Sequence, residues 1–238
     1  MNDVVLNRAT LRAAALPVYP GIALADVRLV DGEALCREVA EALMAADAIG
    51  FDTESKPTFR KGEASTGPHL VQLATEDRAY LFQLSRWHAG DELRAVLESP
   101  RVLKVGFGLG NDRRALQAKL AIEMRNVLDL GEVLRGPGHR GTVGAKVAVA
   151  HFFAQTLQKS KKTGTSNWAA AQLSERQKLY AANDAQLALR VYRAWLRSAP
   201  LAPAPLDGDG APGNRCRTQG QGQALPPPDS LQRIDNAR

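Results

Sequence analysis

The chain has 238 residues, of which 45% are hydrophobic and 24% are charged. This composition is typical of a globular protein with a buried core, and it excludes a chain that is disordered throughout. The formal charge of +6 is compatible with a polyanionic partner. Because phosphate affinity depends on local clusters of Lys and Arg, the net charge alone does not identify that partner.

Cysteine use and hydropathy indicate the compartment. Cys36 and Cys216 belong to neither a C-x-x-C pair nor a zinc-ligand spacing. The first residues contain no basic segment that leads into an apolar run, and no run of about 18 apolar residues occurs anywhere. We therefore expect a cytoplasmic protein in a reducing environment, with no membrane partner.

Apolar periodicity predicts alternating strands and helices along most of the chain. The predicted strands cover residues 27–30, 48–54, 69–75, 79–84, 102–105 and 127–130. The predicted helices cover residues 32–46, 91–98, 111–120, 144–157 and 175–196. Antiparallel strands followed by strand-helix alternation indicate an α/β fold, with a mixed five- or six-stranded sheet and helices on both faces.

Both ends of the chain are expected to lie outside this fold. We predict an N-terminal extension over residues 1–25, a folded domain over 26–197 and a disordered tail over 198–238. The tail holds seven of the 13 prolines and no aromatic residue. Such a segment cannot bury enough apolar area to offset the entropy lost on ordering.

Two acidic residues end the strand predicted over 48–54. Asp52 and Glu54 are two residues apart, and side chains at this spacing point to the same face of a strand. Two like charges in one partly buried place raise each other's pKa, which a divalent cation between them relieves. The alternative is a strand that simply ends in solvent at Asp52.

A glycine-rich loop precedes a third acidic residue. The glycines of segment 106–110 do not match the dinucleotide-binding fingerprint, because the third glycine is misplaced and no ribose-binding acid follows at a suitable position. Asp112 follows this loop and is a candidate site residue. Its alternative role is to cap the helix that begins there.

The last predicted helix carries a tyrosine and a fourth acid. Segment 174–177 (S-E-R-Q) is a capping box that fixes where the helix begins. Tyr180 and Asp184 are four residues apart on the face that Leu187 continues, so they face the domain. Burying an aspartate without a partner costs free energy. Asp184 is therefore expected either to form a structural hydrogen bond or to share a site with the other acids.

The order of these residues resembles the DEDDy-type 3′–5′ exonuclease superfamily, whose four metal-binding acids are accompanied by a helical tyrosine. Further segments are similar to ribonuclease D and to the exonuclease domain of the Werner syndrome helicase. These segments are 67–74 (GPHLVQLA), 159–162 (KSKK), 166–168 (SNW) and 180–185 (YAANDA). The resemblance covers about residues 26–196. The related branch that uses histidine would carry it at position 179, where this chain has Leu179.

This resemblance implies a ribonuclease-H-like fold that hydrolyses DNA or RNA from the 3′ end and releases nucleoside 5′-monophosphates. It also implies two divalent ions, Mg²⁺ or Mn²⁺, for which oxygen ligands are suited. Asp52 would bridge both ions, and Glu54 and Asp184 would hold the ion that generates hydroxide. Asp112 would hold the ion at the leaving group. Tyr180 would orient the attacking water, since a phenol titrates too high to serve readily as a base at neutral pH.

Basic and apolar side chains near these residues are candidates for holding a nucleic acid. The first basic set consists of Lys159, Lys161, Lys162 and Arg176, with Lys178 close by, and the second of Lys56, Arg60 and Lys61. Either set could instead be a solvated surface. Phe107 and Leu109 could stack on or wedge the terminal base, with core packing as the alternative. Trp168 is assigned to packing.

Two further functions are compatible with the same fold. A non-catalytic nucleic-acid-binding domain would be favoured by loss of any of the acids, and all four are present. An endonuclease is the other, and the helical Y-x-x-x-D pattern argues against it. No local motif distinguishes RNA from DNA, because that choice depends on contacts to a 2′-hydroxyl.

Overall fold

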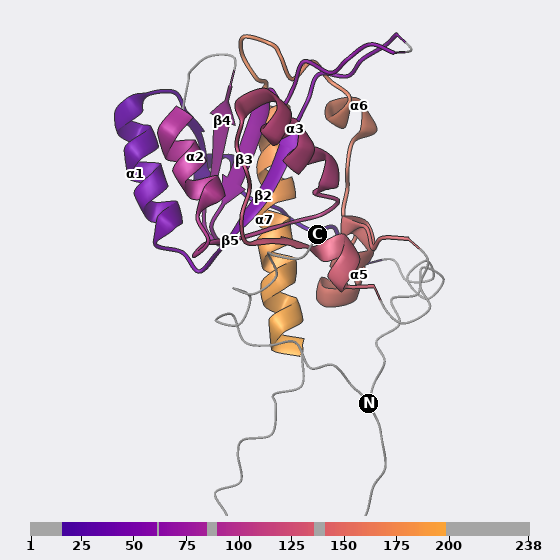
Figure 1. Cartoon of the computed structure of the whole chain (residues 1–238). Helices are drawn as coiled ribbons and strands as arrows, with labels where there is room; N and C mark the ends of the chain where they lie inside the picture. Colours follow the sequence, from indigo (N-terminus) through magenta and orange to yellow (C-terminus); the bar gives the residue numbers. More distant parts are fainter. Residues whose placement is uncertain (1–15, 61, 85–89, 136–140, 199–238) are drawn as a thin grey trace, which may run out of the picture. The chain divides into compact units, whose positions relative to one another are not determined.

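The computed structural model describes residues 16–60, 62–84, 90–135 and 141–198, which are coloured in Figure 1. A six-stranded sheet forms the centre, in the order β1-β4-β3-β2-β5-β6. The strands are β1 (Val27–Val30), β2 (Ala48–Glu54), β3 (Leu70–Ala74), β4 (Ala79–Gln83), β5 (Leu103–Gly106) and β6 (Val127–Asp129). The predicted mixed sheet is confirmed, with six strands.

Strand directions agree with the predicted mixture and add one detail. Strands β2, β3 and β4 form an antiparallel meander. Strands β2, β5 and β6 are parallel neighbours, as expected for strands joined through helices. The first strand, β1, does not pair with β2 but lies parallel to β4 at the edge of the sheet.

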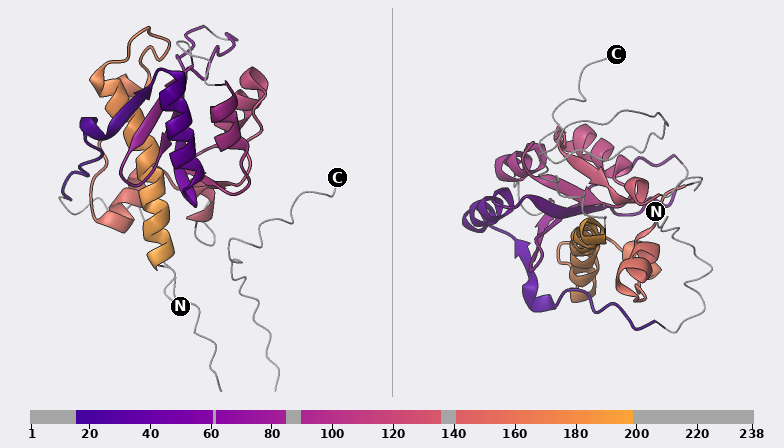
Figure 2. Two further views of the ribbon diagram at one scale, coloured as in Figure 1. Left: turned by 90° about the vertical axis from the view of Figure 1, so that its left-hand side faces the viewer. Right: turned by 90° about the horizontal axis from the view of Figure 1, so that it is seen from below.

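Helices cover both faces of the sheet, as predicted (Figure 2, right). One face carries α1 (Glu33–Met44), α2 (Gly90–Glu98) and α3 (Gly110–Leu120), and the other carries α5 (Ala145–Phe153) and α7 (Glu175–Ser198). The short helical segments are η2 (Leu24–Asp26), α4 (Leu130–Val133) and α6 (Lys161–Gly164). Each face of the sheet therefore has its own apolar core.

Strand β2 shows how the two cores position acidic side chains. Ile49 and Phe51 are fully buried on the face that α1 and α2 cover. Alternation along the strand consequently turns Asp52 and Glu54 toward α7. A Cβ atom at Gly50 would collide with the carbonyl oxygen of Ala185, so glycine at this position allows α7 to lie directly on β2.

The helix predicted over 144–157 is shorter than expected. Helix α5 ends at Phe153, because Ala154 adopts the left-handed conformation with φ of 51°. Leu157 is still buried, but it lies in a segment without regular secondary structure that precedes α6. The prediction extended the helix to Leu157 because this residue continues the apolar face. In the structure Leu157 is buried although the helix has already ended. Helix α6 was not predicted.

Several expectations concern residues outside the described part. The predicted tail from residue 199 onward, Lys61 and Cys216 are among them, and the domain boundaries stay predictions. Residues 16–26 are described and pack against the fold, with Tyr19 and Ile22 buried. Within the described part, no helix combines the length and the apolarity that a membrane crossing requires. Cys36 is a buried free thiol, and burial raises its pKa to about 11.

Candidate active site

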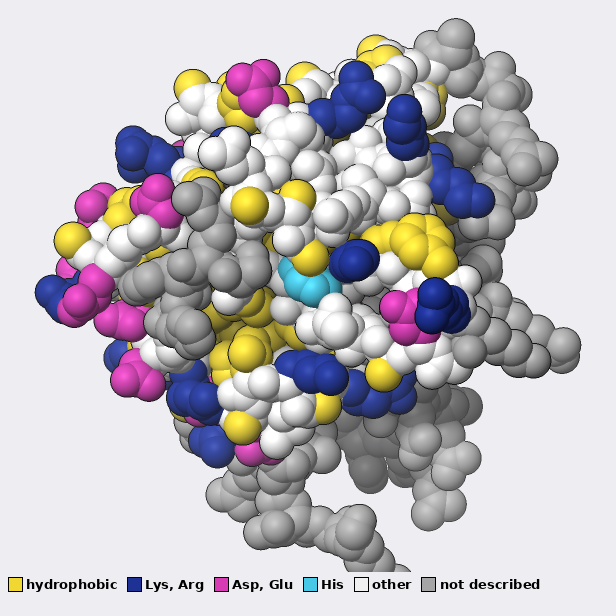
Figure 3. All heavy atoms as spheres, turned by 90° about the horizontal axis from the view of Figure 1, so that it is seen from above, with side chains coloured by type: hydrophobic (Ala, Val, Ile, Leu, Met, Phe, Trp, Pro, Cys, Tyr) yellow, Lys and Arg dark blue, Asp and Glu magenta, His cyan; other side chains and the backbone are white. Residues whose placement is uncertain are grey.

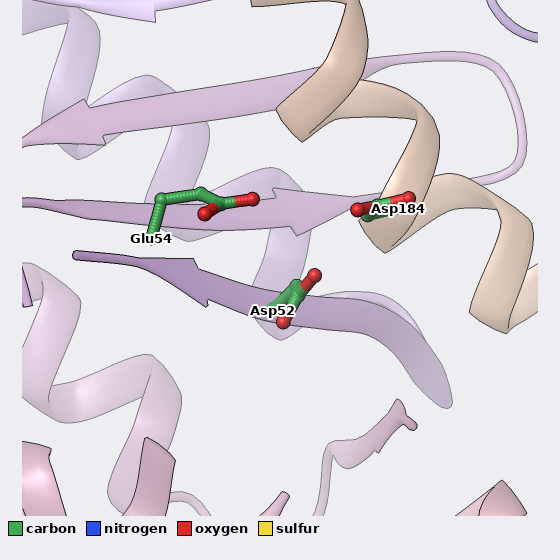
Figure 4. A group of neighbouring side chains, drawn as sticks. All are labelled: Asp52, Glu54 and Asp184. Carbon is green, nitrogen blue, oxygen red and sulfur yellow. The ribbon is translucent and has the colours of Figure 1, made fainter. Parts of the chain in front are cut away.

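Three acidic side chains meet where the end of β2 faces α7 (Figure 4). Asp52, Glu54 and Asp184 each offer a carboxylate oxygen, and these oxygens all lie within 4.8 Å of one another. The capping box predicted at the start of α7 is formed: Gln177 donates its backbone N–H to the Ser174 hydroxyl at 3.3 Å, and Ser174 donates its N–H to Gln177 Oε1 at 3.1 Å. It fixes the helix phase that turns Asp184 toward β2.

Burial and mutual repulsion dominate the electrostatics of this cluster. Burial, followed by the charges of Asp184 and Asp112, raises the pKa of Asp52 well above its usual value. Burial and the charge of Asp52 raise the pKa of Glu54 to about 9. Burial also raises the pKa of Asp184, and Lys159 partly offsets this. Without a cation nearby, the crowding and burial therefore favour protonated over ionised carboxyl groups.

Asp112 contacts β2 at Thr53, the residue between Asp52 and Glu54. It lies in the first turn of α3, for which Leu109 is the N-cap, so the alternative role of helix cap does not hold. The hydroxyl of Thr53 donates a hydrogen bond to Asp112 Oδ1. Asp112 is outside the group of three, yet its charge contributes to the raised pKa of both Asp52 and Glu54.

Asp129 is a supporting residue that the sequence analysis did not identify. Its carboxylate accepts hydrogen bonds from the backbone N–H groups of Gly108 at 2.9 Å, Leu109 at 2.8 Å and Gly131 at 2.8 Å. These bonds fix the loop that leads into α3 and so fix Asp112. The sequence signal that could have identified Asp129 is its position as the last residue of a predicted strand, β6, which lies parallel to β5.

Tyr180 lies one helical turn before Asp184 and is half-buried. Burial and the charge of Asp184 raise its pKa to about 12, so the phenol keeps its proton at neutral pH. A Cβ atom at Gly164 would lie 2.8 Å from the Tyr180 hydroxyl, so glycine leaves room beside it. Trp168 is fully buried behind the tyrosine ring, as its assignment to packing predicted.

The ammonium group of Lys159 contacts the acidic cluster, while its side chain stays 31% exposed. Its Nζ lies 2.8 Å from Asp184 Oδ2 and 5.5 Å from the centre of the Tyr180 ring. Burial alone would lower the pKa of Lys159, but Asp184 and Tyr180 outweigh it and raise that pKa. The structure thus gives Lys159 a contact different from the predicted one to a nucleic-acid backbone.

The other predicted basic residues lie on the surface. Lys161 and Lys162 are exposed on α6, and Arg176 is exposed at the start of α7. Arg176 and Lys159 line an open cleft of about 630 Å³ together with Lys146, which the sequence analysis missed. Figure 3 shows Lys and Arg side chains spread over the face seen from above, while many of the Asp and Glu side chains gather at its left edge.

The remaining predicted contacts divide between core and surface. Leu109 is 1% exposed and packs in the core beneath α3, so the prediction that it stacks on or wedges a base is wrong for this structure and the packing alternative holds. Phe107 is partly buried against the core between α5 and α7. Lys56 and Arg60 are exposed in the loop after β2, on either side of Phe59, which is 84% exposed.

The ligand set indicates which ion the cluster could hold. All the donors in the group of three are carboxylate oxygens, and no His or Cys belongs to it. Hard divalent ions such as Mg²⁺ and Mn²⁺ prefer such oxygen sets, whereas zinc sites are built from His and Cys. The residues therefore fit a magnesium- or manganese-type site.

Comparison with known families agrees with this geometry. A family model described as 3′–5′ exonuclease matches residues 27–197, which include all four acids and Tyr180. The fold and the acidic cluster thus define the class of protein, an exonuclease. The chain belongs to the 3′–5′ exonuclease family.

Curated relatives carry the same activity in their names. The chain is 28% identical over 177 residues to the mouse bifunctional 3′–5′ exonuclease/ATP-dependent helicase WRN, covering 74% of this chain and 13% of that protein. It is 27% identical over 157 residues to an Arabidopsis thaliana 3′–5′ exonuclease, covering 65% of this chain and 54% of that protein. The chain therefore spans about half or less of these two relatives.

Solved structures share the fold. The Aedes aegypti Nibbler EXO domain has a TM-score of 0.62 and 27% identity, covering 73% of this chain and 88% of that one. Escherichia coli RNase D has a TM-score of 0.63 and 21% identity, covering 71% and 44%. Trypanosoma brucei RNase D in complex with RNA has a TM-score of 0.65 and 19% identity, covering 76% and 65%. These matches confirm the expected ribonuclease-H-like fold class.

Proposed function

We propose that the chain hydrolyses phosphodiester bonds of DNA or RNA from the 3′ end and releases nucleoside 5′-monophosphates. The observation that carries this proposal is the meeting of Asp52, Glu54 and Asp184, whose carboxylate oxygens lie within 4.8 Å of one another. Asp112 is hydrogen-bonded to Thr53, the residue between Asp52 and Glu54. These residues come from β2, α3 and α7, so no local structural need brings them together. Membership of the exonuclease family supports the same conclusion.

Two divalent ions, Mg²⁺ or Mn²⁺, fit this site and would supply a hydroxide nucleophile and stabilise the leaving oxygen. Asp52, Glu54 and Asp184 would hold them, with Asp112 completing the set. Ionised carboxylates crowded in one place repel each other, which favours binding of divalent cations.

Tyr180 and Lys159 have roles that follow from their own chemistry. The Tyr180 hydroxyl stays protonated at neutral pH because its pKa is about 12, so it orients a water molecule by hydrogen bond and does not act as the base. Lys159 holds Oδ2 of Asp184 through the 2.8 Å ion pair. It thereby limits the orientations open to that carboxylate.

Nucleic acid is the proposed partner, and the exposed cations around the site support this. Lys161, Lys162 and Arg176 are exposed near Tyr180, and Phe59 offers a ring on which a base could stack. The Trypanosoma RNase D was solved with RNA, which supports the same class of partner. Replacing Lys161, Lys162 or Arg176 by alanine should reduce the salt dependence of oligonucleotide binding by about one unit of slope each.

The test is a time course on 3′-labelled DNA and RNA oligonucleotides of matched sequence, with Mg²⁺ and with Mn²⁺. The proposal expects the label to leave as a mononucleotide from the first time point. Internal fragments would show an endonuclease, and binding without cleavage would show a non-catalytic nucleic-acid-binding domain. The Asp52→Ala variant should be inactive but folded, and Asp77→Ala, which changes an exposed aspartate in the turn between β3 and β4, is the matched control.

A further inference from the structure

An N-terminal segment packs beside the acidic cluster. Residues 16–22, which we call the strap, include Val18, which forms an isolated parallel β-bridge with Thr156. Thr156 donates its backbone N–H to the carbonyl of Pro17 at 2.8 Å, and Tyr19 donates its N–H to the carbonyl of Thr156 at 3.0 Å. Within the described part of the chain, these are the backbone hydrogen bonds that residues 156–159 make.

The strap is also fixed to α7, next to Asp184. Ile22 donates its backbone N–H to Asn183 Oδ1 at 2.8 Å. Gly21 has a φ of 71°, and a Cβ atom there would collide with the side chain of Asn183, so only glycine fits without strain. Tyr19 is buried, stacks on Phe153 at a ring distance of 5.8 Å and accepts a hydrogen bond from Arg190 at 3.3 Å.

The strap and the acidic cluster share a wall. Lys159 lies three residues beyond Thr156, with buried Leu157 between them, and its Nζ contacts Asp184. A small cavity of about 60 Å³ is lined by strap residues Tyr19 and Gly21 together with Lys159 and Asp184. The lysine therefore belongs to a segment whose backbone is hydrogen-bonded to the strap at Thr156.

We propose that the strap is a functional part of the active site, because it positions the segment 156–159 and thereby holds Lys159 against Asp184. The strap precedes residue 27, where the match to the exonuclease family model begins, so that match does not account for it. Lys159 and the strap residues are positioning residues. Their kinetic effect rests on the proposed function, whereas their structural effect does not.

The first test measures the reactivity of Lys159 in the full-length, metal-free protein. Trace acetylation with an N-hydroxysuccinimide ester, followed by mass spectrometry, reports each lysine separately, and the exposed Lys161 and Lys162 serve as internal references. In Gly21→Ala, the reactivity of Lys159 relative to these references should rise about fivefold, as expected when a partly buried ion pair opens. Unchanged relative reactivity in a folded Gly21→Ala protein would overturn the proposal.

Two further variants serve as a control and as an alternative to Gly21→Ala. Gly32→Ala makes the same change at a position before α1 where a Cβ atom meets nothing within 4 Å, so Lys159 should react as in the unchanged protein. If Gly21→Ala does not fold, Asn183→Ala removes the acceptor of the Ile22 N–H without a collision and should give the same increase. A Lys159 that stays protected in Asn183→Ala would then contradict the proposal.

The second test is a double-mutant cycle on exonuclease turnover. Gly21→Ala should lower kcat about tenfold when Lys159 is present, as small displacements in an active site do. In the Lys159→Met background the same change should cost less than about twofold, because the two residues act through one contact. Equal factors in both backgrounds would show that the strap acts independently of Lys159. If the unchanged protein shows no turnover, the proposed function fails, and the acetylation result still decides on the strap.

Discussion

Glu54→Gln should change how the stability of the metal-free protein depends on pH. The pKa of Glu54 is raised from 4.5 to about 9 by burial and by Asp52. Between these values the native state holds a proton on Glu54 that the unfolded chain has released. Stability from this group is therefore complete below about pH 4.5 and is lost as the pH rises toward 9. Glutamine has no such proton, so the variant lacks this loss.

The size of the effect follows from proton linkage. One proton held only by the native state lowers the free energy of unfolding by about 1.4 kcal/mol per pH unit. From about pH 6 to about pH 8 this amounts to at most about 3 kcal/mol, and partial exposure of the carboxyl group reduces it to about 1–2 kcal/mol. The unchanged protein should lose this much more stability than Glu54→Gln over that range.

The assay is chemical denaturation in a chelating buffer at a series of pH values, followed by circular dichroism. Glu38→Gln, which changes an exposed glutamate on α1, is the matched control and should run parallel to the unchanged protein. Added Mn²⁺ should stabilise the unchanged protein most at high pH, because metal ligands must be ionised. If the free energy of unfolding depended on pH in the same way for Glu54→Gln and the unchanged protein, Glu54 would not belong to a buried, crowded carboxylate cluster.

Three substitutions test other parts of the site. Tyr180→Phe should lower kcat about 10- to 100-fold with unchanged Mn²⁺ affinity, since only a water-orienting hydroxyl is lost, and equal rates would show that the hydroxyl is dispensable. Gly50→Ala should lower the free energy of unfolding by about 2 kcal/mol, because its Cβ meets the Ala185 carbonyl; an unchanged value in denaturation would contradict this packing. Thr53→Val keeps the side-chain shape but removes the donor to Asp112, so turnover should fall about tenfold while the melting temperature changes little, and full turnover would exclude this positioning role.

The acidic cluster could be predicted from the sequence because local sequence patterns determine where its side chains point. Alternation along β2 puts Asp52 and Glu54 on one face, and the capping box sets the phase that turns Asp184 inward. Local sequence patterns alone could not predict that β2 packs against α7. That contact depends on Gly50, whose role is visible only against the backbone of α7.

The parts that sequence reasoning missed depend on long-range contacts. Lys159 was expected to bind a nucleic-acid backbone, but its ion pair with Asp184 joins residues that only the fold brings together. The strap was included in an N-terminal extension, because a short irregular segment carries no periodic signal. Its hydrogen bonds to Thr156 and Asn183 replace the regular pairing that periodicity detects.

The central claim is that four acids from β2, α3 and α7 hold a pair of divalent ions. Titration with Mn²⁺, followed by the loss of the free-ion paramagnetic resonance signal, counts bound ions directly and needs no nucleic acid. About two Mn²⁺ ions should bind per chain, as a two-metal site requires, and the Asp52→Ala variant should lose saturable binding. The absence of saturable binding in the unchanged protein, or equal binding in both proteins, would contradict this claim.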